Sequence, residues 1–164
     1  VPVEDEKRQA ILAAGALAPT AENKQPQRIL VVRGDEALAK MDECTRCRFG
    51  APAVLILAYD MTVAARHPDV ADFGMVDIAI VGDHMSLAAE ELGVHSCWVG
   101  LIDPSELRRQ FGIPQTYKIV AVMPLGYPSE RSRPSRLHRM RQGVQKTVFF
   151  DSYATGEDSD APDA

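Results

Sequence analysis

The sequence predicts a domain of the α/β or α+β class, in which helices flank a central mixed sheet on both faces. Short apolar runs alternate along the chain with stretches of helical periodicity. The run from Pro52 to Tyr59 is apolar at every position, as expected for a strand buried on both faces. The stretch from Val70 to Leu92 is apolar on more than one side, so we expect a largely buried helix there.

The elements before this helix follow from local signals. Residues Glu4 to Leu17 begin acidic and continue rich in alanine, which predicts a helix that stops near Pro19. Arg28 to Val32 is a short apolar run and is expected to form a strand. Asp35 to Cys44 carries apolar residues at helical spacing and is expected to form a helix.

The elements after the long helix are delimited by clear start and stop residues. Gly93 ends the helix, and Val94 to Val99 is the next expected strand. Asp103 is a plausible cap for a short helix from Pro104 to Phe111, because proline suits the first helical position. Lys118 to Leu125 is the last clear strand.

The remainder of the chain is basic and then acidic. Gly126 to Gly143 is irregular and rich in arginine, and Lys146 to Phe150 is consistent with either a paired strand or an extended arm. We expect a single domain over residues 1–153, followed by an acidic, disordered tail over residues 154–164. A chain of 164 residues fits one domain and can bury a core without crosslinks.

Composition excludes several classes of protein. The net charge of -5 argues against nucleic acid as the main partner. No apolar stretch approaches the roughly 18 to 20 residues that span a bilayer, and no signal peptide opens the chain. Three cysteines without repeated spacing do not form a secreted disulfide framework. We therefore expect a soluble cytoplasmic protein that contacts no membrane.

The segment from Ala18 to Pro26 is the first candidate binding element. Thr20, Asn23 and Gln25 offer hydrogen-bond donors and acceptors to the edge of a heteroaromatic ligand, and two prolines would stiffen the loop that carries them. The alternative is an ordinary polar loop after the end of a helix, because turns are rich in these residue types.

The segment from Gly93 to Gly100 is the second candidate. Gly100 would let the main chain approach a flat ligand, and main-chain N–H groups there would meet a ring nitrogen. The alternative is a core strand in which Trp98 is a packing residue.

Two further clusters remain open to more than one interpretation. Five arginines fall within eleven residues and would suit phosphate recognition, or would form a solvated basic loop: Arg131, Arg133, Arg136, Arg139 and Arg141.

Cys44 and Cys47 form a CxxC pair, which is consistent with structural thiols, a regulatory disulfide or half of a metal site. No GxGxxG, GxxxxGK[ST] or GxSxG motif occurs, which disfavours a classical dinucleotide fold or a hydrolase.

Taken in order, these pieces resemble the nitroreductase family of FMN-dependent oxidoreductases, from about Val3 to Tyr127. The first block is ILAAGALAPTAENKQPQRILVV, which is similar to the helix, APS–x–x–N–x–Q–P and strand signature of the family. The second is FGAPAVLILAYD. The third runs from DFGMVDIAIV through LGVHSCWVG and FGIP to PLGYP, and is the most specific of the three.

The resemblance implies an obligate homodimer with two FMN sites at its interface. Electrons would pass from NADH or NADPH to a small organic acceptor such as a nitroaromatic, a quinone or a similar compound, in alternate visits to one flavin. The flavin would carry the chemistry, so no catalytic side chain is nominated and no metal is expected. The alternative function is a non-catalytic flavin carrier or sensor, or a homologue that has lost FMN. Flavin fragmentation or dehalogenation ranks lowest, because the long lid insertion expected for it is missing.

The resemblance also assigns site residues by position. Those expected to face the flavin or line its ring near N5 are Pro19, Thr20, Asn23, Gln25, Trp98, Val99 and Gly100. Those expected to approach its phosphate are Arg133 and Arg136. A main-chain N–H near Gly100 is expected to donate to N5.

The sequence departs from the family pattern at several positions. Thr20 replaces a serine, Gln27 replaces a frequent tryptophan, and Asp83-His84 replaces Gln-Asn. Family members also carry an Arg-rich stretch before the first helix, which grips the flavin phosphate. In this sequence no such stretch precedes Val1, so either it has been removed or the phosphate is held more weakly, and the later arginines are expected to compensate in part.

Overall fold

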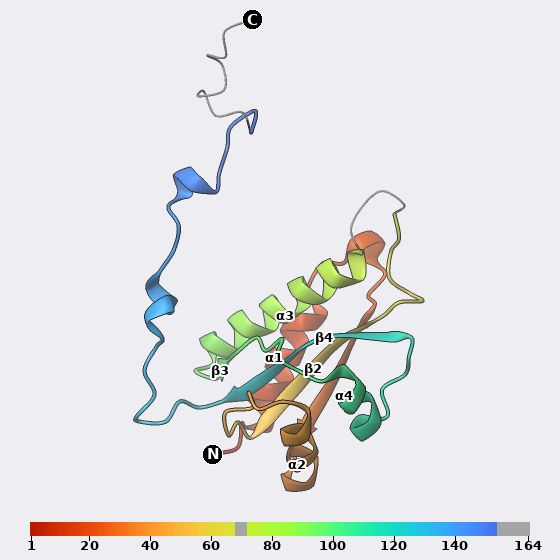
Figure 1. Cartoon of the computed structure of the whole chain (residues 1–164), viewed down its shortest axis with the longest axis vertical. Helices are drawn as coiled ribbons and strands as arrows, with labels where there is room; N and C mark the ends of the chain where they lie inside the picture. The colour runs from red at the N-terminus through yellow and green to blue at the C-terminus, as the bar shows by residue number, and fades with distance from the viewer. Residues whose placement is uncertain (68–71, 154–164) are drawn as a thin grey trace, which may run out of the picture. The chain divides into compact units, whose positions relative to one another are not determined.

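The structure is a computed structural model that describes residues 1–67 and 72–153 (Figure 1). The chain divides into two units, Val1–Ser129 and a second unit that begins at Glu130, and each is described by itself. The expected single domain over residues 1–153 therefore stays a prediction. The expected disordered tail falls on residues 154–164, which lie outside the described residues.

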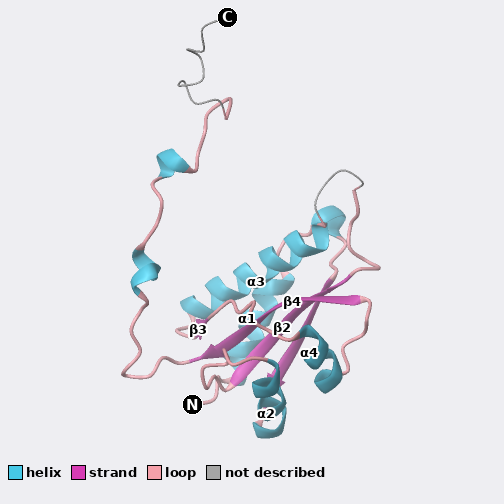
Figure 2. Cartoon of the chain, viewed as in Figure 1, coloured by secondary structure: helices cyan, strands magenta, loops and turns pink. Residues whose placement is uncertain are grey.

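The first unit alternates helices and strands in nearly the predicted order (Figure 2). Its elements are α1 (Asp5–Ala16), the 3₁₀ turn η1 (Ala21–Asn23), β1 (Gln27–Arg33), α2 (Asp35–Cys44), β2 (Ala53–Asp60), α3 (Phe73–Glu91), β3 (His95–Ser96), α4 (Pro104–Phe111) and β4 (Tyr117–Gly126). Among the described residues, no helix combines the length and the apolar character needed to cross a membrane.

The four strands form one sheet in the order β1-β2-β4-β3, and every neighbouring pair is antiparallel. The expected mixed sheet is therefore wrong for the described residues. An entirely apolar strand is typical of parallel sheets, but β2 is buried because it lies between two antiparallel neighbours and under helices on both faces.

Helices cover both faces of the sheet, as predicted (Figure 1). Leu55 and Leu57 of β2 point into a core shared with α1 and α3. The alternate residues Val54 and Ile56 point into a second core, shared with α2 and α4. This alternation follows from the two-residue period of a strand, and it makes β2 the centre of the molecule.

The helix α3 is buried along one side only. Its buried positions include Ile78, Val81 and Met85, which face α1 and the sheet. Its opposite side leaves Val76 42% exposed and Leu87 65% exposed. The prediction of a largely buried helix therefore holds for one face and not for the other.

The start of α3 is fixed to the sheet. Asp72 caps α3 by accepting the N–H of Gly74 at 3.1 Å, and it also accepts the hydroxyl of Tyr59 from β2. Burial is the main cause that raises the pKa of Tyr59, and the Asp72 carboxylate adds to it. A side chain at Gly74 would overlap the ring of Tyr59, so glycine is needed where the helix crosses β2.

The second unit contains two short 3₁₀ turns, η2 (Arg136–Arg139) and η3 (Val144–Lys146). No strand forms over residues 146–150 in this structure. The rings of Phe149 and Tyr153 pack edge to face at 5.2 Å, and both remain exposed.

Candidate functional site

The loop between α1 and β1 has an unusual backbone. Glu22, Asn23 and Gln25 all adopt positive φ angles, of 52°, 53° and 49°. The left-handed region costs a residue with a Cβ roughly 1–2 kcal/mol, and asparagine is the member of this set that tolerates it best. Three such residues within four positions indicate a strained loop, and strain of this kind concentrates at binding sites.

Hydrogen bonds within the loop hold this conformation. The hydroxyl oxygen of Thr20 accepts the N–H of Gln25 at 3.0 Å. The Gln25 side-chain amide donates to the Asn23 side-chain carbonyl at 3.1 Å. Thr20, Asn23 and Gln25 therefore form one connected polar group, and Asn23 and Gln25 are exposed.

A bond to α3 anchors the same loop. Oδ1 of Asp77 accepts the N–H of Ala21 at 2.8 Å across 56 positions of sequence. Asp77 is 1% exposed, and its other oxygen, Oδ2, is buried without a hydrogen-bond partner among the described residues. Asp77 was missed by the sequence analysis, although a carboxyl group on the apolar side of a helix was a signal that could have found it.

The second candidate segment also packs on α3. A side chain at Gly82 would overlap the ring of Trp98, so the indole lies directly on the helix backbone there. Trp98 nevertheless stays 39% exposed, which leaves part of the ring available to another surface. Trp98 is the only tryptophan in the chain.

Two main-chain N–H groups become free directly after Val99. Val99 is held in the sheet, because its N–H donates to the Val122 carbonyl at 2.9 Å and its carbonyl accepts from the Val122 N–H at 3.0 Å. Its side chain is buried in the core, so only neighbouring main-chain groups can meet a ligand. The N–H groups of Gly100 and Leu101 donate to no group among the described residues.

Gly100 itself faces open space. No atom lies within 4 Å of the point where a Cβ would stand, so packing within this chain does not require a glycine there. The Leu101 carbonyl accepts the Thr45 hydroxyl at 2.7 Å, and the Asp103 N–H donates to the Cys44 carbonyl at 2.9 Å. These bonds fix the segment while leaving the two N–H groups unused.

The structure thus brings two predicted segments onto one helix. The loop contacts α3 at Asp77, and Trp98 contacts it at Gly82. Gly82 lies five residues after Asp77, which is about 7.5 Å along the helix axis and about 140° around it. We treat the loop from Pro19 to Gln25 and the segment from Trp98 to Leu101 as the two parts of the candidate site. Their assignment to a flavin remains a prediction.

The predicted phosphate residues lie in the second unit. The Arg133 guanidinium donates to the carbonyls of Glu130 and Ser132 at 2.9 and 2.7 Å, and Arg136 begins η2. Both side chains are exposed. Their role at a phosphate stays a prediction.

Cys44 of the CxxC pair has the character of a structural thiol. Cys44 is buried and donates to the Lys40 carbonyl at 3.3 Å, while Cys47 is partly exposed. Burial raises the pKa of the Cys44 thiol to about 11, and nearby Glu106, Asp103 and Glu43 add to the shift. Because the thiolate is the reactive form, Cys44 is a poor nucleophile in this fold.

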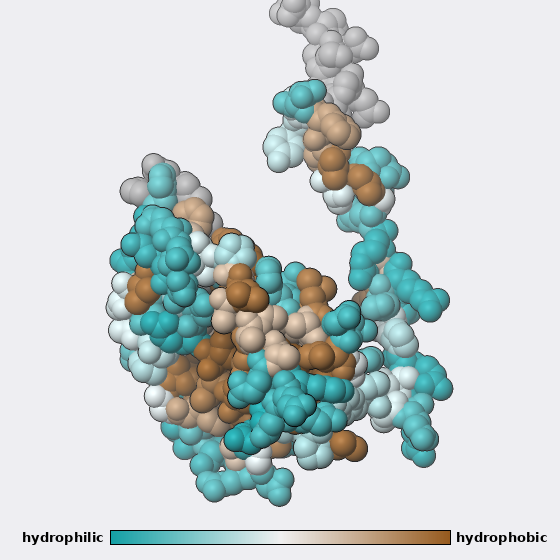
Figure 3. Space-filling view, turned by 180° about the vertical axis from the view of Figure 1, so that it is seen from behind, coloured by the Kyte–Doolittle hydropathy of each residue, from teal (hydrophilic) through white to brown (hydrophobic). Residues whose placement is uncertain are grey.

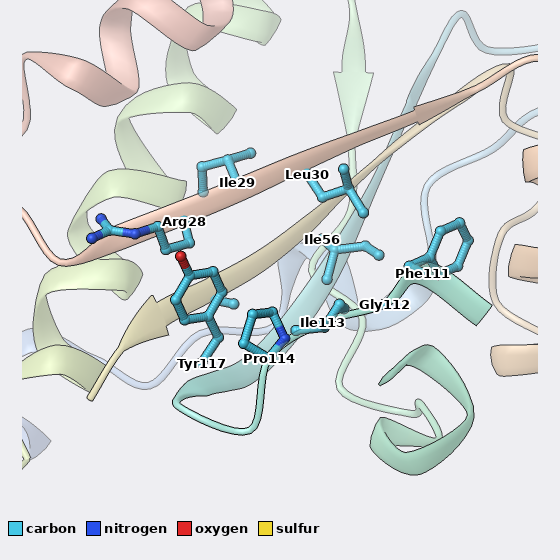
Figure 4. A pocket seen from close by; sticks show the side chains of 10 residues that line it. Arg28, Ile29, Leu30, Ile56, Phe111, Gly112, Ile113, Pro114 and Tyr117 are labelled. Carbon is cyan, nitrogen blue, oxygen red and sulfur yellow. The ribbon is translucent and has the colours of Figure 1, made fainter. Parts of the chain in front are cut away.

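An apolar pocket lies on the opposite side of the sheet, between β1, β2 and the loop after α4 (Figure 4). Its volume is about 260 Å³. The Arg28 guanidinium lies 5.6 Å from the centre of the Tyr117 ring at one end of this pocket. The pocket includes none of the predicted site residues, which therefore do not share it.

Fold and site together define an α+β protein in which a helix-covered antiparallel sheet supports a strained polar loop beside a strand end with free N–H groups. The chain belongs to the nitroreductase family, whose model matches residues 1–49 and 42–127. A relative from Archaeoglobus fulgidus, named as an NADH dehydrogenase/NAD(P)H nitroreductase, is 34% identical over 155 residues, which cover 84% of this chain and 86% of the relative. The expected family is confirmed.

Solved structures agree with this assignment. A nitroreductase family protein from Clostridium difficile 630 is 30% identical, with a TM-score of 0.85 over 93% of this chain and 89% of that one. A nitroreductase from Exiguobacterium sibiricum, solved in complex with FMN, is 19% identical with a TM-score of 0.77 over 92% of this chain and 88% of that one. At this identity the second likeness shows the fold alone.

Proposed function

We propose that this chain is an FMN-dependent oxidoreductase that passes electrons from NADH or NADPH to a small organic acceptor. The names of its relatives support the class of enzyme and both cofactors, since they include an NAD(P)H nitroreductase and an NADPH-flavin oxidoreductase. The observation that carries the proposal is the pair of unused N–H groups at Gly100 and Leu101. They follow Trp98, whose ring packs on α3, and the same helix anchors the strained loop.

The residues present fit an isoalloxazine ring. The open space at Gly100 admits a flat group close to the main chain, where a side chain would obstruct it. The loop presents amide and hydroxyl groups of Thr20, Asn23 and Gln25 for the polar edge of the ring, already fixed in one conformation. Such preorganisation lowers the entropy lost on binding.

FMN, when bound, would accept two electrons from the nicotinamide and release them to the acceptor. The work left to this chain is to bind, orient and tune the ring. The N–H of Gly100 or Leu101 would donate to the ring, and the partly exposed face of Trp98 would border it. Arg133 and Arg136 are proposed to bind the phosphate, because a guanidinium fork binds two oxygens.

We further propose that the protein works as a homodimer in the cytoplasm. Apolar side chains gather on the surface of the protein, shown brown in Figure 3. On α3, the exposed Val76 and Leu87 lie eleven residues apart and therefore on one face of the helix. Three cysteines without a disulfide fit a reducing compartment.

The test is reconstitution of the purified full chain with FMN, followed by anaerobic addition of NADH or NADPH. We expect a yellow protein whose flavin absorption bleaches and then returns when a quinone or a nitroaromatic compound is added. Yellow protein that never bleaches would favour the flavin carrier. Protein that takes up no FMN would refute the proposal.

A further inference from the structure

An aspartate at position 77 is expected to destabilise the fold, because its carboxyl group is buried. It lies on the buried side of α3 among Gly74, Ile78 and Val81, and is 1% exposed. A buried polar group without a partner costs free energy, and Oδ2 has no partner among the described residues. No ion pair to Asp77 occurs within residues 1–67 and 72–153, so no cation compensates for the burial. An apolar residue would serve the core better, which points to a role for the carboxyl group.

That role is visible in its one hydrogen bond. Ala21 opens the turn η1, so its N–H has no acceptor within the turn. Oδ1 of Asp77 accepts it at 2.8 Å. Among the described residues, this is the one hydrogen bond that joins residues 20–24 to a helix or a strand, because the others stay within the loop.

The loop needs such an anchor because its own backbone opposes the conformation. Glu22, Asn23 and Gln25 are left-handed, and residues of this kind persist where the surrounding structure over-determines them. The bond between Thr20 and Gln25 closes the loop upon itself but does not attach it to the rest of the protein. Arg28 of β1 donates to the Gln25 carbonyl at 3.4 Å, at the end of the loop next to the strand. Asp77 supplies the shorter attachment at the other end, at 2.8 Å and one residue before the first left-handed position.

We propose that Asp77 is a positioning residue of the candidate site: its carboxyl group fixes the loop from Thr20 to Gln25 in the left-handed conformation that presents these side chains to the cofactor. This inference rests on the proposed function for the identity of the ligand. The positioning of the loop itself can be measured without any ligand, so failure of one can be told from failure of the other.

The first experiment compares Asp77→Ala and Asp77→Asn by amide hydrogen exchange of the FMN-free protein. In Asp77→Ala, residues 21–25 should exchange at least tenfold faster, while the central strand β2 and the C-terminal half of α3 keep their protection. Asp77→Asn retains an acceptor oxygen for the Ala21 N–H and should restore most of the protection. Glu90→Ala is the matched control, because Glu90 is an exposed acidic residue on the same helix.

The second experiment titrates FMN into the same variants. Asp77→Ala should bind FMN on the order of tenfold more weakly, as expected for one lost hydrogen bond to a carboxyl group, with Asp77→Asn and Glu90→Ala close to the parent protein. Faster loop exchange with unchanged FMN affinity would show that the loop does not hold FMN, which would overturn the link to the cofactor. Unchanged exchange at residues 21–25 would overturn the positioning role itself.

A third variant covers the case in which Asp77→Ala unfolds. Ala21→Pro removes the donor from the loop side, and proline suits the first position of a turn that follows an extended residue such as Thr20. It should reproduce the faster exchange of residues 22–25 and the weaker FMN binding. If Ala21→Pro folds and leaves both unchanged, the hydrogen bond has no positioning role and the proposal is wrong.

Discussion

At the scale of single residues, Gly82 and Trp98 form the contact that is easiest to test. A Cβ at position 82 would overlap the indole ring and would stand 3.1 Å from Leu57. In Gly82→Ala we expect the ring to swing outward, because Trp98 is already 39% exposed and has room to move. The displaced ring would lose packing contacts, but alanine is about 1 kcal/mol more favourable than glycine in a helix. Because these two effects oppose each other, thermal stability should change little.

The measurement is tryptophan fluorescence, since Trp98 is the only emitter of its kind. The emission of Gly82→Ala should shift to the red, and its quenching by added FMN should weaken relative to Glu90→Ala. An emission spectrum of Gly82→Ala identical to that of Glu90→Ala would contradict the packing of Trp98 on Gly82. A parent protein whose emission is not quenched by FMN would show that Trp98 does not border the cofactor.

Cys44 gives a prediction about pH. Burial raises its pKa from 9.0 to about 11, so the folded protein holds the thiol proton over a range where the unfolded chain releases it. The unfolded state therefore binds fewer protons between these values, and the free energy of unfolding falls as the pH rises from about 9 to about 11. Below pH 9 the stabilisation is fully present.

Because Tyr59 also has a raised pKa, the effect of Cys44 must be isolated by difference. Chemical unfolding of the parent protein and of Cys44→Ala should be compared across this pH range. The stability of the parent should fall more steeply than that of the variant. Parallel curves would mean that Cys44 titrates in the folded protein as it does in the unfolded chain.

At the scale of elements, local signals predicted what local chemistry controls. The bounds of α2 and α4 agree with the sequence to the residue, and the Asp103 cap forms as expected, accepting from Ser105 and Glu106 at 2.9 and 3.0 Å. The strand β3 is shorter than predicted, because only two of its residues find partners in β4 and Val99 pairs alone. The length of a strand depends on its pairing with residues distant in sequence, and the local sequence does not indicate where that pairing ends.

The left-handed loop likewise depends on contacts between residues that are distant in sequence. A glycine in a sequence indicates a possible positive φ angle, whereas Glu22 and Gln25 give no such indication. Their conformation depends on the bond from Ala21 to Asp77, across 56 positions. The polar residues of the loop could therefore be selected from the sequence, but neither their geometry nor their anchor could.

The arginine segment of the second unit carries a prediction of its own. The double variant Arg133→Ala/Arg136→Ala should lose on the order of tenfold or more in FMN affinity, because charge-assisted contacts to phosphate are among the strong hydrogen bonds. Riboflavin lacks the phosphate, so its binding should not change. Arg139→Ala/Arg141→Ala is the matched control from the same cluster. An equal loss for riboflavin and FMN, or an unchanged FMN titration, would place the phosphate elsewhere.

At the scale of the whole molecule, the relative direction of neighbouring strands could not be predicted from the sequence. Alternating helices and strands suggested a mixed sheet, yet every pairing is antiparallel. Hydrophobic periodicity records which faces are buried and not which way a strand runs, so helices on both faces were predicted and direction was not. The order β1-β2-β4-β3 also bears on the position of the candidate site, because it places the short strand β3 at the edge of the sheet. Trp98 follows β3 two residues later, and its ring packs against Gly82 of α3.

The exposed apolar face of α3 predicts that two chains associate. Val76 and Leu87 lie on one face of α3, and their exposure of 42% and 65% leaves apolar area that a second copy would bury. Leu87→Lys places a charge in that area, and in sedimentation it should convert a dimer of the parent protein into a single chain. Phe49→Lys is the control, because Phe49 is 69% exposed and lies in the loop before β2. If each flavin site needs both chains, Leu87→Lys must lose FMN together with the dimer. A parent protein that binds FMN as a single chain would contradict both the dimer and the shared site.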